Sequence, residues 1–236
     1  GMTITLGSPL TIEDVVSVAR GGEDVALSDT AVAAMAATRR IIEELADDPA
    51  PHYGISTGFG ALASTQIPPE RRRQLQRSLV RSHAASAGPE VEREVVRATM
   101  LLRLATLSTG RTGVRPLVAE TYVALLNAGI TPIVGEYGSL GCSGDLAPLA
   151  HCALALMGEG AVRDASGTRM DAADALAAAG ITPVVLEEKE GLALINGTDG
   201  MLGMLSMALR DFDELLLIAD ASAAMSIEGL AGTDTV

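Results

Sequence analysis

Residues 138–151 of the chain, GSLGCSGDLAPLAH, have the composition most open to unusual chemistry. Small residues crowd the first half of this stretch, which indicates a backbone whose conformation or close approach a side chain would obstruct. The triplet Cys142-Ser143-Gly144 can condense with itself. The Gly144 amide nitrogen attacks the Cys142 carbonyl carbon, one water leaves as a five-membered ring closes, and a second water leaves from Ser143. The product carries an exocyclic methylene and is an electrophile, which the ordinary side chains do not supply.

Other kinds of chemistry have to be weighed for the same residues and for one further motif. A glycine-rich turn before a helix binds anions at the helix N-terminus. Cys142 with His151 would suit a cysteine hydrolase, but no electropositive surroundings accompany the pair. Residues 141–145 are not a nucleophile elbow, because Asp145 occupies the place of the second glycine. Residues 58–63, GFGALA, match G-x-G-x-x-A, yet a dinucleotide site needs a preceding strand that the sequence does not indicate.

The composition limits both fold and partners. Hydrophobic residues make up 48% of the chain and aromatic residues only 2%, with no tryptophan, so the core must be built from Ala, Leu, Val, Ile and Met. Such a core favours close-packed helices and predicts a mainly α fold. The net charge of −13 argues against nucleic acid and anionic membranes as partners.

Cysteine usage and hydropathy bear on the compartment. The two cysteines form no C-x-x-C pair, which fits a reducing, cytoplasmic setting and gives no indication of a metal. The first residues lack a basic region followed by a long apolar run, so we expect no signal peptide. No uncharged apolar run reaches the length of a membrane span.

Periodicity and capping residues predict the elements that would position the reactive groups. Thr11 and Asp14 form a capping box, Ser28 is a helix N-cap, and Pro116 starts a helix that Gly129 closes. Helices are expected at 11–21, 28–46, 68–83, 90–108, 116–127, 171–179 and 201–225, with another beginning at 145. One small hairpin is expected at 162–170, and loops at 52–67, 130–144 and 192–197.

Three segments together resemble one enzyme family. They are residues 53–60 (YGISTGFG), 138–149 (GSLGCSGDLAPL) and 194–198 (LINGT). In order and spacing, over nearly the whole chain, they are similar to the aromatic amino-acid ammonia-lyases. The resemblance implies that family's self-made cofactor, 4-methylideneimidazole-5-one, formed here from Cys142, Ser143 and Gly144. Cys142 stands where alanine is commonest, but the ring uses only the backbone carbonyl of that residue.

The resemblance also implies roles for single residues. Tyr53 corresponds to a loop tyrosine that serves as base for the β-proton, and Asn196 to an asparagine that holds the cofactor or substrate. His83, in residues 81–85 (RSHAA), matches the form of the histidine-specific members and would contact a substrate imidazole. The expected catalytic residues are thus Tyr53, Ser143 and Asn196, with His83 and Leu140 binding substrate. Taken alone, the tyrosine, histidine and asparagine would be a packed aromatic, a helix-end cap and a turn residue.

The activity implied is elimination of ammonia from L-histidine to give trans-urocanate. Elimination from tyrosine or phenylalanine, and migration of the amine in a 2,3-aminomutase, use the same cofactor and loops. A non-catalytic helical assembly module is the alternative of another class. Retention of Tyr53, Ser143 and Asn196 argues against that module for the parent protein.

Members of this family are about twice as long as the present chain, and they are homotetramers. We therefore expect residues 2–200 to form an N-terminal helical domain and residues 201–236 to begin a central bundle of long helices. The further active-site groups of the family lie in its second half. By itself the 236-residue chain is expected to be inactive, with the ring-forming triplet left as an ordinary tripeptide.

Overall fold

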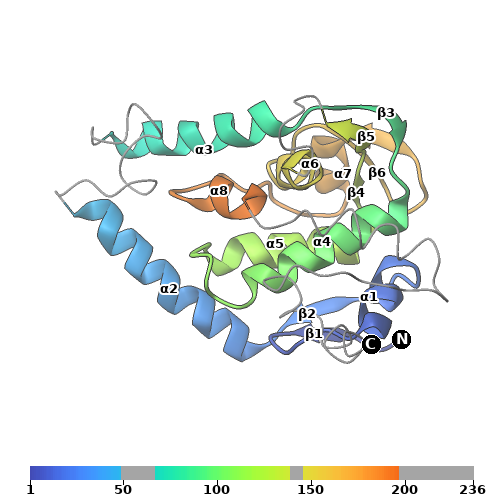
Figure 1. Ribbon diagram of the computed structural model, residues 1–236, viewed down its shortest axis with the longest axis horizontal. Coiled ribbons are helices and arrows are strands. Elements are labelled where there is room, and N and C mark those ends of the chain that lie inside the picture. Colours follow the sequence, from blue (N-terminus) through green and yellow to red (C-terminus); the bar gives the residue numbers. More distant parts are fainter. Residues whose placement is uncertain (49–66, 139–145, 197–236) are drawn as a thin grey trace, which may run out of the picture.

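The computed structural model describes residues 1–48, 67–138 and 146–196, and within them the chain is mainly α-helical, as the composition predicts (Figure 1). The helices are α1 (Ile12–Ala19), α2 (Asp29–Asp47), α3 (Pro69–His83), α4 (Arg93–Leu107), α5 (Pro116–Asn127), α6 (Leu146–Leu156), α7 (Ala172–Ala178) and α8 (Glu190–Ile195). The strands are β1 (Ile4–Leu6), β2 (Val25–Leu27), β3 (Ser86–Glu90), β4 (Thr131–Pro132), β5 (Gly135–Gly138), β6 (Ala161–Arg163) and β7 (Arg169–Asp171).

Local sequence signals set several helix boundaries. The Thr11 hydroxyl accepts from the Asp14 amide at 3.1 Å, and the Asp14 carboxylate accepts from the Thr11 amide at 3.0 Å, which completes the expected capping box of α1. Ser28 caps α2 by accepting from the Ala31 amide. Pro116 begins α5, where its missing N–H is not needed.

The strands form three small sheets rather than one hairpin. β1 and β2 pair in parallel and are joined by α1. β3 and β5 pair antiparallel, with Ser86 opposite Gly138. β6 and β7 form the expected hairpin, to which β4 adds a third strand.

Helix α6 is the centre of the core. Its buried residues lie on every side of the helix, and it packs against α3, α4, α5 and α8 as well as β4. A helix that is apolar all round is stable only when other elements surround it. Figure 1 shows α6 nearly end-on between α3 and the pair α4–α5. Residues 139–145 are therefore followed directly by a helix that other elements of the core surround.

Three expectations about local structure are wrong in part. The segment 130–144, expected to be irregular, contains β4 and β5, because it pairs with strands far away in sequence. The segment 192–197, expected to be a loop, is largely the helix α8. Helix α4 begins at Arg93, because Gly88 and Pro89 belong to β3.

Several expected features lie outside the described residues. They are the loop at 52–67 except for its last residue, the ring-forming triplet with Leu140 and Asp145, the proposed domain boundary at 200 and the helix from 201. Among the described residues, no helix has both the length and the apolar character needed to cross a membrane.

Candidate active site

Two of the sequence-predicted site residues, His83 and Asn196, lie at the ends of mutually packed helices. His83 is the last residue of α3 and Asn196 directly follows α8. Helix α3 packs on α6 and α8, and α6 packs on α8. Since α6 begins one residue after Asp145, the same three helices also hold the C-terminal side of the ring-forming segment. Tyr53, Leu140, Cys142, Ser143 and Gly144 lie outside the described residues.

The imidazole of His83 is oriented by its own helix. Its Nδ1 lies 2.9 Å from the carbonyl oxygen of Leu79, and the Ser82 hydroxyl donates to the same oxygen at 3.0 Å. Because a carbonyl oxygen can only accept, Nδ1 must carry a proton. In the neutral imidazole, Nε2 is then the acceptor. The helix end therefore presents a half-buried histidine with a defined tautomer.

Asn196 is held through its backbone. Its amide donates to the Leu192 carbonyl at 2.6 Å, and its own carbonyl accepts from Nη1 of Arg103 at 3.1 Å. The same Nη1 lies 3.3 Å from the carbonyl oxygen of Ala193. Arg103, on α4, thus caps the carbonyl end of α8, where a positive charge is favourable. The Asn196 side chain is exposed among the described residues, so it is available to a neighbouring group.

The opposite end of α8 is fixed by α3. The Gln76 side-chain oxygen accepts from the Gly191 amide at 2.8 Å. A Cβ at Gly191 would lie 2.8 Å from the Gln76 carbonyl oxygen, so only glycine permits this approach. Lys189, just before the helix, adopts a left-handed φ of 66°, which costs a non-glycine residue free energy. The start of α8 is therefore a strained turn that long-range contacts hold in place.

Glu190 supplies one of those contacts. Its carboxylate is completely buried and accepts from Nη2 and Nε of Arg115 at 2.8 and 3.0 Å. It also accepts from the backbone amides of Glu187 and Arg115. Bidentate, charge-assisted pairs of this kind are the strong ones. Glu190 therefore closes the turn and ties α8 to the start of α5.

Glu188 extends the network to two more helices. One of its carboxylate oxygens accepts from Arg39 of α2 at 3.0 Å, and the other lies 3.3 Å from Nη2 of Arg72 on α3. Arg39 also donates to the carbonyl oxygens of Glu188 and Gly113. Because Arg39 and Arg72 are buried, solvent screens these pairs little, and removing Glu188 would leave uncompensated buried charges.

The ring-forming segment is flanked by rigid elements. β5 ends at Gly138 and α6 begins at Leu146, with Pro148 in its first turn as expected. Helix α6 has eleven residues, and the N-terminus of such a helix carries a partial positive charge. The described residues thus place a strand end before the segment and a helix start after it.

Cys152, the described cysteine, is not a nucleophile. It is fully buried on α6, and burial raises the pKa of its thiol to about 12. Tyr122, beside it, is also buried, and burial raises the pKa of its phenol well above its ordinary value. Both groups stay protonated at neutral pH and belong to the core.

Other cofactor classes find no support in the described residues. In that part of the chain, no group of three or more His, Cys, Asp or Glu side chains could hold a metal ion. The parallel strands β1 and β2 do enclose a helix, but they lie far in sequence from residues 58–63. The described element that precedes that glycine motif is the helix α2 rather than a strand.

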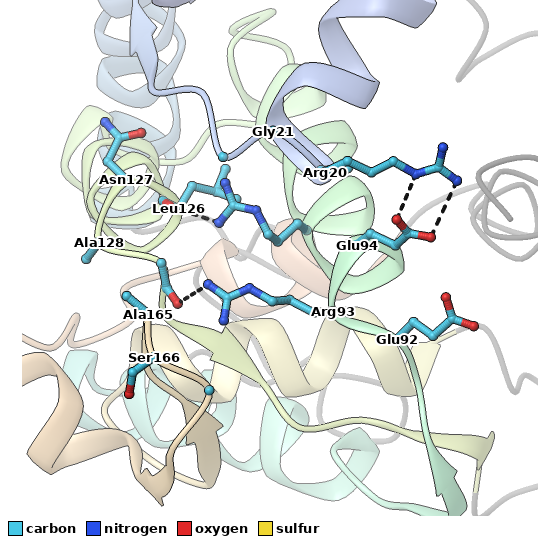
Figure 2. A pocket seen from close by; sticks show the side chains of 15 residues that line it. Arg20, Gly21, Glu92, Arg93, Glu94, Leu126, Asn127, Ala128, Ala165 and Ser166 are labelled. Atoms are coloured by element: carbon cyan, nitrogen blue, oxygen red, sulfur yellow. Dashed lines mark hydrogen bonds and ion pairs between the residues drawn. The ribbon is translucent and has the colours of Figure 1, made fainter. Parts of the chain in front are cut away.

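A pocket of about 860 Å³ lies elsewhere, where α1 and α5 end near the start of α4 (Figure 2). Arg97 donates to the carbonyl oxygens of Val18 and Leu126 at 2.9 and 3.0 Å, and Arg93 donates to that of Gly129 at 2.8 Å. These guanidinium groups neutralise the carbonyl ends of two helices. Their role is structural.

At the rim of this pocket, Arg20 is also paired with a side chain of the protein. Figure 2 shows Arg20 paired with Glu94, with Nε and Oε2 2.7 Å apart. None of the site residues expected from the sequence lines the pocket. It is therefore separate from the candidate active site.

Sequence reasoning missed four residues that support the site, namely Gln76, Ser86, Arg103 and His151. Arg103 stands alone in an apolar helical run, MLLRLATL, and a buried arginine in such a run implies a specific partner. Gln76 and Ser86 carry no comparable signal, because their partners are distant in sequence. In the sequence, His151 stands out only as a partner for Cys142. Its Nε2 instead lies 2.9 Å from the Ser86 hydroxyl.

Comparisons with known proteins identify the family of the chain. Residues 10–236 match the family model described as aromatic amino acid lyase. The chain is 63% identical over 235 residues to histidine ammonia-lyase of Streptomyces avermitilis, covering 99% of this chain and 46% of that protein. The chain thus spans about half the length of the curated relatives it matches.

Solved structures of the same type share the fold. Histidine ammonia-lyase from Trypanosoma cruzi superposes with a TM-score of 0.78 at 35% identity, covering 89% of this chain and 40% of that one. Tyrosine aminomutase from Streptomyces globisporus gives the same TM-score at 40% identity, covering 88% and 39%. The family model spans nearly all of the sequence, including the three segments that suggested the resemblance. The chain belongs to the aromatic amino acid lyase family.

Proposed function

We propose that this chain forms the N-terminal part of an enzyme that eliminates ammonia from L-histidine to give trans-urocanate. The observation that carries the proposal is the 63% identity to a histidine ammonia-lyase over 99% of the chain. Those relatives are about twice as long, so we propose that the catalytic unit also contains residues beyond these 236.

The proposed cofactor is 4-methylideneimidazole-5-one, formed from Cys142, Ser143 and Gly144. When formed, it supplies an electrophilic methylene that assists departure of a poor leaving group, ammonia. Gly144 suits the nucleophilic amide because no Cβ crowds its nitrogen. The start of α6 supports the proposal, since a helix N-terminus is positive and α6 begins two residues after Gly144 in the sequence.

His83 is the proposed contact for the substrate side chain. Its Nδ1–H is committed to the Leu79 carbonyl, so Nε2 of the neutral ring is free to accept an N–H. The imidazole of histidine offers such an N–H, whereas the ring of phenylalanine offers none. A buried acceptor left unpaired is costly, which gives discrimination between the two substrates.

Tyr53, Asn196 and Leu140 complete the proposed set. Tyr53 would accept the β-proton, and Leu140 would line the pocket. The Asn196 amide would hold the substrate or the cofactor by hydrogen bonds. The support for Asn196 is its exposed side chain on a backbone that Arg103 fixes. A rigid backbone beneath a flexible amide is what a positioning group requires.

Assembly and location are part of the same proposal. By family resemblance we propose a homotetramer for the full-length protein. The low cysteine content and acidic charge support a cytoplasmic location, with no nucleic-acid or membrane partner.

Product analysis tests the proposal. The full-length protein is incubated with L-histidine, L-tyrosine or L-phenylalanine, and products are separated by chromatography. We expect urocanate from histidine and little product from the other two. His83→Leu should reduce the preference for histidine, while Arg81→Gln, which removes a surface ion pair with Glu159 at the same end of α3, is the matched control. A protein that prefers tyrosine or phenylalanine would contradict the assignment of substrate.

A second activity is favoured by one observation. The chain is 40% identical to the solved tyrosine aminomutase, a higher identity than to the solved Trypanosoma cruzi enzyme. An aminomutase would return the amine to the β-carbon. The same chromatography distinguishes the two activities, because a β-amino acid would then accumulate in place of the unsaturated acid. Absence of any product would favour the non-catalytic alternative.

A further inference from the structure

One hydroxyl group joins both described flanks of the ring-forming segment. Ser86 lies on β3, opposite Gly138, the last described residue before that segment. Its Oγ accepts from the Gly135 amide of β5 at 2.8 Å. The same Oγ lies 2.9 Å from Nε2 of His151 on α6. β5 leads into the segment and α6 leads out of it, so the Ser86 side chain connects its entrance to its exit.

The protonation of this bridge follows from its surroundings. Burial lowers the pKa of His151 below its ordinary value, so the imidazole is neutral at neutral pH. The Gly135 amide fills one lone pair of the hydroxyl oxygen. With a proton on Nδ1 of His151, Ser86 donates to Nε2; with the proton on Nε2, Ser86 accepts it. Both tautomers close the bridge.

Most of α6 is held by apolar packing. Such packing sets the distance between α6 and its neighbours, but it restricts sliding of the helix along its own axis less well. Among the described residues, the bond between His151 and Ser86 is a polar side-chain contact that links α6 to β3 and, through the Gly135 amide, to β5. Hydrogen bonds have a narrow range of length and angle. The bridge therefore fixes α6 relative to the strand that precedes residues 139–145.

Ring closure needs such a constraint. The Gly144 nitrogen must bond to the Cys142 carbonyl carbon, losing its proton and that of the Ser143 nitrogen with the carbonyl oxygen as water. A second water then leaves with the Ser143 hydroxyl and α-proton. An unconstrained chain rarely brings the Gly144 nitrogen into contact with the Cys142 carbonyl carbon. Holding two reacting atoms together increases the rate of a reaction by a large factor.

We propose that Ser86 and His151 are positioning residues for ring closure, acting by clamping the two ends of the segment that contains residues 142–144. The proposal rests on the proposed function, because it presupposes that the ring forms. Neither residue is assigned contact with the reacting atoms. They act through β5 and α6.

The test measures ring closure separately from activity. The full-length protein is made by cell-free synthesis, samples are quenched at intervals, and intact mass reports the loss of two waters. We expect Ser86→Ala and His151→Phe to close the ring about threefold to tenfold more slowly than wild type, as loss of one hydrogen bond implies. Ser86→Thr, which keeps the hydroxyl, should restore the wild-type rate.

A matched control removes a hydroxyl elsewhere. Ser108 follows α4 and donates to the Ala105 carbonyl at 2.7 Å, with no link to β5 or α6. Ser108→Ala should therefore close the ring at the wild-type rate. Circular dichroism confirms folding for each variant. Activity divided by the ring-closed fraction should match wild type in Ser86→Ala, with an unchanged KM, because the clamp does not touch substrate.

Two results are distinguishable. If wild type loses two waters and Ser86→Ala does so at the same rate, the clamp is wrong and the proposed function stands. If wild type never loses the waters and forms no product from histidine, the proposed function fails, and this inference fails with it. Should His151→Phe not fold, the Ser86→Ala and Ser86→Thr pair still decides the question.

Discussion

Helices α6 and α8 each adjoin residues proposed for the active site, but they are stabilised in different ways. Helix α6 follows the ring-forming segment, and α8 precedes Asn196. α6 has eleven residues, is apolar all round and lies at the centre of the core. α8 has six residues and depends on charged and polar side chains from α3, α4 and the start of α5. Apolar packing holds α6. Helix α8, whose Leu194 and Ile195 also belong to the core, is in addition anchored at both ends by ion pairs and hydrogen bonds.

The difference between the two helices follows from their lengths. A six-residue helix forms few internal hydrogen bonds and is marginal in isolation. α8 also starts from the left-handed Lys189, which adds strain. Buried arginines and glutamates compensate, and they fix Asn196 at the far end. α6 needs no such support, except for the bond from His151 to Ser86 at the ring-forming segment.

The largest effect is expected at Glu190. Glu190→Gln keeps the shape of the side chain but leaves Arg115 without its buried counter-charge. Breaking a buried pair on one side costs about 3–5 kcal/mol of the free energy of unfolding. Urea denaturation followed by circular dichroism measures the loss.

A surface pair serves as control for that prediction. Glu90 and Arg163 pair at 2.7 Å, but both side chains are 35% exposed. Glu90→Gln should cost less than about 1 kcal/mol. Equal losses for the two variants would show that the charge network does not stabilise α8.

A smaller effect is expected at Arg103. Arg103→Met keeps the length of the side chain and removes the donor to the carbonyls of Ala193 and Asn196. A hydrogen bond from a charged donor contributes about 2 kcal/mol, and the contact to Ala193 at 3.3 Å is long and therefore weak, so stability should fall by roughly the amount of one such bond. Because Asn196 loses its anchor, turnover per ring-closed enzyme should fall as well.

Arg97→Met is the matched control. Arg97 is equally buried on the same helix and also donates to two backbone carbonyls, those of Val18 and Leu126, away from α8. It should lose similar stability with unchanged turnover. If both variants lose turnover alike, the link from Arg103 to Asn196 is not specific.

The smallest effect concerns His151 and pH. Its pKa is lowered by burial in the folded protein, whereas in the unfolded chain it is about 6.5. Below that pH the unfolded chain binds more protons, so the free energy of unfolding falls as pH falls. The contribution is complete above about pH 6.5. His151→Phe should flatten this part of the profile, and denaturation at pH values on either side measures it. An unchanged slope would contradict the assignment.

Local signals made much of the fold predictable. The capping residues Thr11 and Ser28 and the proline at 116 mark helix starts that the structure confirms. The β4, β5 and α8 segments were missed because their partners are distant in sequence. β5 pairs with β3, and α8 is held by Gln76 and Arg103. Such support leaves no periodic pattern in the segment itself.

The candidate site was predictable in a different sense. The triplet at 142–144 could be singled out by its composition, but its meaning came from resemblance to a family. Tyr53, His83 and Asn196 have ordinary structural alternatives when each is considered alone. The supporting residues could not be found this way, because a serine such as Ser86 acquires its role only from what surrounds it.

The most direct test of the account is the intact mass of the full-length protein beside its Ser143→Ala variant. We predict that wild type is lighter than its sequence by two water molecules and forms urocanate from L-histidine, while the variant has its full mass and forms none. A wild-type protein of unaltered mass that still converts histidine would contradict the account, because the electrophile would then come from elsewhere.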